Sequence, residues 1–485
     1  MINNYLIPVL LIIPLIAASL SLLKFSDKVL FHLTSVFCGI EMILSLIQLR
    51  IVYINGEQFF AGKLFFTDML SSFQMTIVSI VFFAASVYGT GYFANDTAAL
   101  KHSRRYSALW NLFLFTMVLV LSSNNMGMLW VAIEATTLAS AFLIMTYGEP
   151  SSIEAMWKYL LICSVGIAFG LIGTMLLSAA SRVTGSMEPS LLWTDLRTTA
   201  SMFDKGIMLA AFIFVLIGFG TKAGLAPMHT WLPDAHSQAP TPVSAVFSAV
   251  MLNSAFYCVL RYLPLTESAL GETGQTRGLL LFFGLLSICT AMVFIPAQKD
   301  IKRFLAYSSI EHIGIIVVGI GLGGIGVVAA LLHTFNHSFA KMLSFFSAGK
   351  ISHTFGTKDM GRIQGALKTN RYWGAGFFAG TLALIGTAPF AIFTSELQIF
   401  RAGFNSGRYG ILALLLIGTV TIFIAALKHI MGVSLGKPGS NEKHKPELGE
   451  KLLVVSCILI ALIPGLFVPG FLWNILTKAA LIIGK

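Results

Sequence analysis

Residues 220–242 read GTKAGLAPMHTWLPDAHSQAPTP, and the interpretation of the whole chain depends on this stretch. It contains one lysine, two histidines, one aspartate and four prolines, and strongly apolar runs flank it on both sides. A charged side chain in the hydrocarbon core of a membrane costs at least about 2.5 to 3.5 kcal/mol, so such residues usually face a bundle interior and mark an ion path.

Gly224, Pro227 and Pro233 are expected to break the helix in this stretch. Broken backbone at membrane depth is tolerated only inside protein or beside water. The sequence therefore predicts a discontinuous membrane helix that carries Lys222 to its break. A lysine that only ties two helices together through a neighbouring carboxylate is the alternative.

The composition is that of a membrane protein. Of 485 residues, 56% are hydrophobic and only 11% charged, whereas soluble domains carry about 25% charged residues. The net charge of +11 would suit a nucleic-acid-binding protein, but the basic residues lie in short loops between apolar runs, a pattern of membrane orientation. The five cysteines lie far apart in apolar segments, which predicts no disulfide framework, zinc site or iron–sulfur ligand set.

An all-α polytopic membrane protein with about fourteen transmembrane helices is predicted when about 20 mainly apolar residues are required for each span. The spans lie near residues 5–23, 29–49, 65–93, 106–123, 126–147, 154–181, 207–227, 240–263, 278–296, 302–321, 325–349, 372–402, 409–431 and 451–475. Nineteen Lys and Arg residues fall on the side of the loops after odd-numbered helices and ten on the other side, so the positive-inside rule places both termini outside. Arg261, near a helix end, is expected to reach the membrane interface.

A faint internal repeat is visible in the chain. Ala-Ile-Glu ending at Glu134 resembles Ser-Ile-Glu ending at Glu311, and an Ala-Pro pair precedes Asp234 and Glu396 at the same distance. The offset is five helices, so the repeats would be inverted in the membrane, with helices 7 and 12 broken, unless the similarity is chance. The expected parts are N-terminal helices, two five-helix repeats and a C-terminal helix, at residues 1–105, 106–263, 278–432 and 451–485 respectively.

Glu134 lies near the middle of its predicted span, with Thr136 and Thr137 as polar neighbours. Burial favours the uncharged form of a carboxyl group, and a nearby cation such as Lys222 favours the charged form. The sequence predicts that these two residues form a switchable ion pair. A static bridge is the alternative.

His333, His337 and Lys341 recur every four residues, which places them on one helix face. Imidazole titrates near neutral pH, and a desolvated lysine can lose its proton. This pattern predicts a proton wire, although histidines packed in a core would give the same spacing. Glu396 follows a break at Pro389 and is expected at the far end of the path, or else at the membrane interface.

Glu311 and His312 are adjacent and point in different directions, which favours His312 as the relay residue. Weaker candidates are Glu41, Lys158, His229, Asp234, His236 and Glu311; the histidines and Asp234 could equally satisfy backbone groups that the prolines free. The sequence predicts no catalytic, cofactor or metal site, because phosphate-binding and dinucleotide motifs and cluster cysteines are lacking. The energy for transport is therefore expected from a partner subunit or an ion gradient.

Three motifs resemble one protein family. Residues 222–242 with WLPDAHSQAP, DIKRFLAYSS at 300–309 and HSFAK at 337–341 are similar to the antiporter-like membrane subunits of respiratory complex I, cation/proton antiporters and group 4 nickel–iron hydrogenases. The similarity covers about residues 106–430, and WKYL at 157–160 is most similar to the hydrogenase-4 component F type.

The resemblance implies a fourteen-helix fold with two inverted five-helix units and a polar axis along the membrane. By position, it implies that Glu134 and Lys222 are the coupling pair, Lys341 the central lysine and Glu396 the terminal residue.

The function that the resemblance implies is a proton-translocating membrane subunit of a redox-driven complex of the hydrogenase-4 or formate hydrogenlyase type, in a bacterial or archaeal cytoplasmic membrane. Expected partners are other membrane subunits, a peripheral redox arm and the lipid bilayer, and no nucleic acid. Alternatives are an NADH-quinone oxidoreductase subunit like M or N, a cation/proton antiporter subunit, or a scaffold that no longer conducts. Ser248 and Asn253 stand where relatives can carry a histidine or lysine, so a non-conducting scaffold stays among the alternatives.

Overall fold

The computed structural model describes residues 5–94, 96, 100–182, 190–271, 274–436 and 448–484. Four basic residues that entered the prediction of orientation lie outside these ranges: Lys437, Lys443, Lys445 and Lys485. The chain divides into two compact units, which we call the first unit (Met1–Gly224, Met251–Leu279 and Asn474–Lys485) and the second unit (Leu225–Val250 and Leu280–Trp473).

The first unit contains most of the N-terminal half of the chain. Its elements are α1 (Leu6–Ser21), α2 (Asp27–Asn55), β1 (Gln58–Phe60), β2 (Phe65–Thr67), α3 (Met69–Tyr92), α5 (Ser103–Ser122), α6 (Met126–Ile144), α7 (Pro150–Arg182), α8 (Trp193–Thr199), α9 (Lys205–Ala223), α12 (Leu252–Leu270) and most of α21 (Gly470–Ile483). The two short strands form an antiparallel pair that pairs Gln58 with Thr67.

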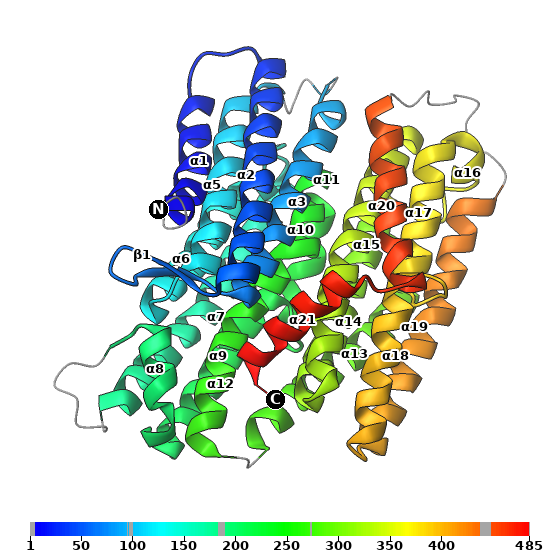
Figure 1. Cartoon of the computed structure of the whole chain (residues 1–485). Coiled ribbons are helices and arrows are strands. Elements are labelled where there is room, and N and C mark those ends of the chain that lie inside the picture. Colours follow the sequence, from blue (N-terminus) through cyan, green and yellow to red (C-terminus); the bar gives the residue numbers. More distant parts are fainter. Residues whose placement is uncertain are drawn as a thin grey trace. The chain divides into compact units, whose positions relative to one another are not determined.

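Polar side chains start several of these helices. Asp68 accepts the Ser71 amide N–H in a capping box ahead of α3, and Asn125 accepts two amide N–H groups at the start of α6. In the packed unit α2 lies against α3, and α1 and α2 both lie beside α5 (Figure 1). α7 and α9 approach closely at Gly170 and Gly218, where a Cβ atom on Gly218 would collide with the backbone of Gly170 and one on Gly170 would press against the ring of Phe219.

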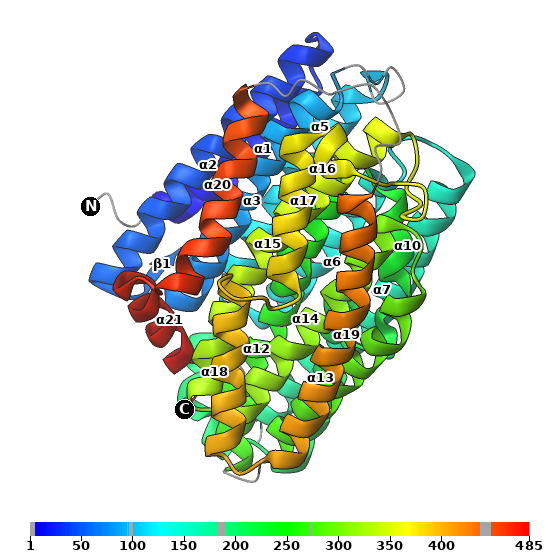
Figure 2. The same cartoon turned by 90° about the vertical axis from the view of Figure 1, so that its right-hand side faces the viewer.

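The second unit contains the remaining helices. They are α10 (Trp231–Gln238), α11 (Thr241–Val246), most of α13 (Gln275–Phe294), α14 (Ile301–Leu322), α15 (Ile325–Phe355), α16 (Ala366–Thr369), α17 (Arg371–Leu384), α18 (Ala391–Asn405), α19 (Tyr409–Leu435) and α20 (Leu448–Leu466). α15 packs against α14, α17, α18 and α20, and Figure 2 shows α15, α17 and α20 side by side.

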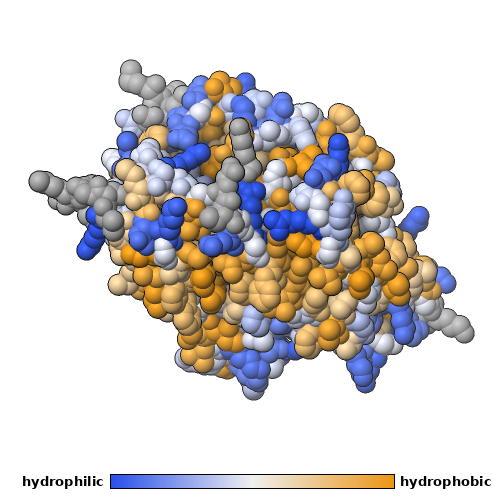
Figure 3. Space-filling model, turned by 90° about the horizontal axis from the view of Figure 1, so that it is seen from below, coloured by the Kyte–Doolittle hydropathy of each residue, from blue (hydrophilic) through white to orange (hydrophobic). Residues whose placement is uncertain are grey.

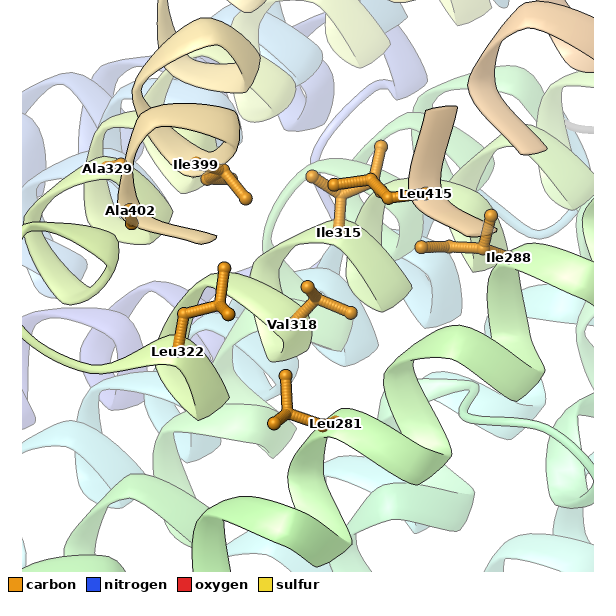
Figure 4. Packing of buried hydrophobic residues seen from close by; sticks show 9 residues of the cluster. All are labelled: Leu281, Ile288, Ile315, Val318, Leu322, Ala329, Ile399, Ala402 and Leu415. Carbon is orange, nitrogen blue, oxygen red and sulfur yellow. The ribbon is translucent and has the colours of Figure 1, made fainter. Parts of the chain in front are cut away.

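A cluster of buried aliphatic side chains joins five helices of the second unit (Figure 4). Leu281 and Ile288 come from α13, Val318 from α14 and Leu415 from α19, and they meet further residues of α14, α15 and α18. Ile288 is 1% exposed and Val318 is fully buried. Packing of this kind fixes the helices that carry the polar residues described below.

Eleven helical segments of the described chain are long and apolar enough to cross a membrane. Many of their side chains are both apolar and exposed, such as Leu161 and Val165 on α7 and Ile424 on α19. Figure 3 shows a broad band of apolar side chains across this face, with hydrophilic side chains above and below the band, including a group near the middle of the view. Exposed apolar surface on this scale is what a multi-pass membrane protein presents to lipid.

Each predicted span contains helix, but several details differ from the prediction. The predicted span 451–475 is two helices, α20 and α21, interrupted ahead of Pro469. Pro233 does not break a helix, because it lies in the first turn of α10, where a missing amide N–H is tolerated. The pairing of β1 with β2 ahead of the third span was not predicted.

The two predicted helix breaks are present. α9 ends at Ala223 because Gly224 takes a left-handed conformation with φ of 80°, and Pro227 follows it. α17 ends at Leu384, and Gly386 (φ 69°) with Pro389 separates it from α18. A five-residue π-helical turn, Phe247–Met251, precedes α12 and was not predicted. The inverted repeat itself and the number of membrane-crossing helices stay predictions.

Candidate functional site

Lys222 is fully buried at the end of α9 in the first unit. Its ammonium group donates to the backbone carbonyl of Ile133 (3.2 Å), to the hydroxyl of Thr137 and to the hydroxyl of Tyr159 (3.4 Å). It also lies 5.6 Å from the centre of the Tyr159 ring. Three neutral oxygen atoms therefore hold the cation next to the helix break, and Ile133 and Thr137 present theirs because they lie one turn apart on α6.

Glu134 is half-buried on α6, one residue after a carbonyl that Lys222 contacts. Its Oε1 atom accepts a hydrogen bond from the hydroxyl of Ser164 (2.7 Å) on α7. The carboxylate lies within electrostatic range of Lys222, but no direct ion pair joins the two in the described part of α6 and α9. The static bridge is therefore not formed in this structure, and the switchable pair stays a prediction.

Three histidines meet in the second unit, between α14 and α15. Nδ1 of His312 lies 3.0 Å from Nε2 of His333, and the rings of His312 and His337 are centred 5.1 Å apart. Nδ1 of His333 lies in turn 3.0 Å from the hydroxyl of Ser395 on α18. All three imidazoles are fully buried. The predicted face of α15 is present, and His312 joins it from the neighbouring helix.

Lys341 continues this face one turn after His337 and is also fully buried. Its ammonium group donates to the backbone carbonyl of Leu305 (2.8 Å) and to the hydroxyl of Ser308 (2.9 Å). Glu311 and His312 both lie within electrostatic range of it. Like Lys222, this lysine rests on neutral oxygens, so its charge can change without breaking a direct ion pair.

Glu396 is half-buried on α18, the helix that follows the break, and its carboxylate lies near His312 and His333. A Cβ atom at Gly386 would meet its carboxylate, so the carboxylate covers the turn between α17 and α18. One carboxylate oxygen of Glu396 and one nitrogen each of His312 and His333 lie within 4.8 Å of one another. The sequence predicts no metal site, yet imidazole and carboxylate are ligands that transition metals take, and this group of three side chains could hold such an ion.

The weaker candidates divide between the surface and the interior. Lys158 is 46% exposed and pairs with Glu154 (2.7 Å) one turn away on α7, so it lies apart from the buried groups around Lys222. Asp234 forms an ion pair with Arg303. This pair holds α10 against α14 and leaves the carboxylate 24% exposed.

The two histidines of the predicted break pack among aromatic rings. His236 is fully buried and stacks on Phe345 at 5.3 Å, and His229 lies 6.3 Å from Tyr307 between ring centres. Glu311 is 3% exposed on α14. These observations do not test proton transfer by His229, His236 or Glu311, so their roles stay predictions.

The sequence prediction for Arg261 was wrong. Its guanidinium is 2% exposed and binds both oxygens of Asp68 at 2.6 and 2.8 Å, and it lies over the rings of Phe66, Trp193 and Tyr257. It therefore joins the start of α3 to α8 and α12 and does not reach the interface.

The sequence analysis missed three further polar contacts of the site, which come from Tyr159, Ser164 and Ser395. Tyr159 is adjacent to Lys158 and Ser395 is adjacent to Glu396 in the sequence, whereas nothing in the sequence marks Ser164.

Comparisons with known proteins agree with this architecture. Residues 123–425 match the family described as NADH:quinone oxidoreductase/Mrp antiporter, transmembrane. The chain is similar to a hydrogenase-4 component F homologue of Methylacidiphilum infernorum, with 36% identity over 414 residues, 84% of this chain and 86% of the relative. It is also similar to NADH-quinone oxidoreductase subunit N of Desulforudis audaxviator, with 29% identity over 77% of this chain and 74% of that protein.

Two solved structures of multi-subunit membrane complexes contain a similar chain. One is the archaeal membrane-bound sulfane sulfur reductase, with a TM-score of 0.89, 22% identity and coverage of 100% of this chain and 98% of the other. The other is the Mrp complex from Dietzia, with a TM-score of 0.87, 18% identity and the same coverage. At these identities the likeness shows the fold alone, and it confirms the predicted all-helical membrane class.

Proposed function

Because the chain belongs to the NADH:quinone oxidoreductase/Mrp antiporter transmembrane family, we propose that it is the proton-translocating membrane subunit of a redox-driven complex of the hydrogenase-4 or formate hydrogenlyase type. The resemblance inferred from the motifs is confirmed by these matches. The observation that carries the proposal is the buried row of His312, His333, His337 and Lys341.

Proton transfer in the second unit would use the two nitrogens of each imidazole. A neutral imidazole that accepts a proton at one nitrogen can release the proton at the other, so the 3.0 Å contact between His312 and His333 is a transfer step in either direction. Lys341 can give its proton to this row and keep its hydrogen-bonding oxygens, Leu305 and Ser308. A metal or redox group is not needed for these steps.

The first unit would contribute a second set of proton-binding groups. When Glu134 is ionised, its field favours the charged form of Lys222, and when it is protonated, Lys222 more readily releases a proton. In the present arrangement the Glu134 carboxyl is bonded to Ser164 and the Lys222 ammonium to Thr137, so each group has a neutral partner of its own. Proton transfer along the groups of each unit is part of the proposal.

The driving force would come from partners. We propose that the chain sits among other membrane subunits in a bacterial or archaeal cytoplasmic membrane, with both termini outside, and that a peripheral redox arm supplies the energy. Lys222, Lys341 and the three histidines at 312, 333 and 337 are fully buried among helices, which suits a subunit that moves protons in response to its neighbours.

The test is the variant Lys341→Ala, with Lys24→Ala as a matched control because Lys24 is exposed. In sealed vesicles that contain the assembled complex, we expect Lys341→Ala to lower proton translocation per electron at least about tenfold, since a positioned proton-transfer group contributes on this scale or more. The control should pump normally. Normal assembly with undiminished pumping in Lys341→Ala would overturn the proposal, and a strict requirement for sodium would assign the chain to cation/proton antiport.

A further inference from the structure

A second polar region lies in the N-terminal helices, outside the residues that match the family. One face of α2 presents polar side chains at intervals of three and four residues, which is the spacing of a single helix face. Its members are Thr34, Cys38, Glu41, Ser45 and Gln48. Each of them is at most 4% exposed, and Glu41 is fully buried. An α2 face toward lipid would be apolar, so this face is turned into the protein.

The helices packed against this face, α3 and α5, add polar groups of their own. The hydroxyl of Thr76 on α3 donates to the carbonyl of Ser45 (3.3 Å), and the amide of Asn111 on α5 donates to the hydroxyl of Thr34 (3.5 Å). Together they form a polar seam, which we define as Thr34, Cys38, Glu41, Ser45, Gln48, Ser72, Thr76, Ser79, Ser107 and Asn111. All ten are buried within the first unit.

Several atoms of the polar seam lack a protein partner. Among the described residues, neither carboxylate oxygen of Glu41 has a hydrogen-bond partner, and the same holds for the hydroxyls of Ser72 and Ser107 and the side-chain oxygens of Gln48 and Asn111. Buried polar groups are nearly always hydrogen-bonded, and ordered water molecules supply the hydrogen bonds where no protein group does. A cluster of such groups around one carboxyl is therefore a place for water molecules and a proton.

Within the part of the chain that the structure describes, Glu41 has no counter-cation. The helices packed against α2 are α1, α3 and α5, and over their described residues the only charged side chains are Arg104 and Arg105, which are exposed at the start of α5. The titratable groups near Glu41 are the Cys38 thiol on α2 and, beside that thiol, the Tyr106 hydroxyl on α5. A buried carboxylate without a cation or a hydrogen bond is unfavourable, so the group needs a proton, water or both.

An open pocket lies at the end where α2 and α5 begin. It has a volume of about 580 Å³ and is lined by Asp27 and by residues 100–105, which include Lys101, His102, Arg104 and Arg105. The Asp27 carboxylate accepts a hydrogen bond from the Ser103 hydroxyl (2.5 Å). Asp27 precedes Thr34 by about two helical turns, and Thr34 precedes Glu41 by two more. The polar seam thus begins about two turns from this pocket, and the buried ring of Phe31, which packs against Phe93 and Tyr106, lies between the pocket and Thr34 on the same helix.

We propose that Glu41 is a proton-binding site in a hydrated polar seam of α2, α3 and α5, and that it exchanges its proton with the pocket at Asp27 past the ring of Phe31. The ligand is a proton with its associated water. The site shares no residue with the groups around Lys222 or Lys341. It is therefore independent of the function proposed above, and the two can fail separately.

Infrared spectroscopy on the intact complex in lipid tests the site. The wild type is expected to show a carbonyl band of a protonated carboxyl that shifts when the sample is moved to deuterium oxide. Glu41→Gln should lose this band, while Glu57→Gln, an exposed control just after α2, should keep it. Lys341→Ala should also keep it, which separates this test from that of the proposed function. A band retained in Glu41→Gln, or one that does not respond to deuterium, would overturn the site.

Two further measurements keep the proposal open to refutation if Glu41→Gln does not assemble. A hydrophobic carbodiimide reacts with protonated buried carboxyls, so mass spectrometry of the treated wild type should find the adduct on Glu41, and its absence counts against the site. Asn111→Leu replaces a polar group of the seam by an apolar one of similar size. It should slow the deuterium shift several-fold, and an unchanged rate would show that exchange does not follow the seam.

Discussion

His312 on α14 and His333 on α15 share a hydrogen bond of 3.0 Å in a fully buried site, 21 residues apart in the sequence. Only one of the two facing nitrogens can carry the proton when both rings are neutral. The protonation of one ring therefore sets the tautomer of the other. Ser395 extends this dependence, because its hydroxyl contacts the second nitrogen of His333 at 3.0 Å.

We expect His312→Gln to lower proton translocation at least about tenfold, because glutamine cannot take up a proton at one atom and release it at another. His102→Gln is the control, since His102 is exposed at the start of α5. Dye-based measurements of pumping in vesicles, normalised to electron transfer, give the comparison. Equal pumping by both variants would exclude His312 from the path.

Ser395→Ala removes the hydroxyl that contacts His333 and leaves both imidazoles in place. The expected result is a smaller loss of pumping than in His312→Gln, because the variant disturbs only the tautomer preference of His333. Nitrogen NMR of labelled histidine should show a changed tautomer population for His333. An unchanged spectrum would contradict the role assigned to this hydroxyl.

Thr137→Val removes a hydroxyl acceptor from Lys222 with little change in volume. The charged form of the lysine loses a hydrogen bond in a buried site, so proton release should become easier and the pH profile of pumping should change. Thr136→Val is the matched control, because the Thr136 hydroxyl is bonded to its own helix. Identical pH profiles for the two variants would count against the contact to Thr137.

The buried pair of Arg261 and Asp68 predicts a stability effect. Arg261→Met leaves a buried carboxylate without its cation and should cost about 3–5 kcal/mol. The corresponding change at Arg277, whose pair with Glu267 is about one fifth exposed, should cost roughly 1 kcal/mol or less. Thermal unfolding in detergent measures both. The double variant of Arg261→Met with Asp68→Asn should lose less unfolding free energy than Arg261→Met alone. An equal loss in the two variants would contradict the role of this ion pair.

The same pair predicts a dependence on pH. Burial acts to raise the pKa of the Asp68 carboxyl at the start of α3, but the facing Arg261 guanidinium outweighs burial and holds this pKa below its usual value. A carboxyl of this kind stabilises the fold above its unfolded pKa of about 3.9, and the contribution is lost as the pH falls through the folded value. Thermal stability should therefore fall below about pH 4 in the wild type and fall less in Asp68→Asn.

The parts of this fold that local sequence governs could be predicted. Gly224 and Pro227 mark the end of α9 because a left-handed glycine and a proline cannot continue a helix, and the spacing of His333 and Lys341 places them on one face because a helix has a fixed period. The position of Lys222 next to the helix break follows from the same glycine and proline.

Contacts between distant segments could not be predicted in this way. Arg261 and Asp68 are separated by 193 residues, and nothing in the sequence around Arg261 distinguishes a buried guanidinium from one at the interface. Likewise Lys222 contacts Tyr159 on another helix, whereas the adjacent Lys158 points outward. A helix pattern tells which side chains share a face but not which other helix that face meets.

Arg261 also has a consequence for how the first unit opens. Its guanidinium is held by Asp68 and three aromatic rings, and Trp193 donates to its backbone carbonyl at 2.7 Å. The entry to α3, the short helix α8 and the middle of α12 can therefore come apart only together. Their amide hydrogens should exchange with solvent in one cooperative event, slowly and at a common rate, while the outer helix surfaces exchange residue by residue.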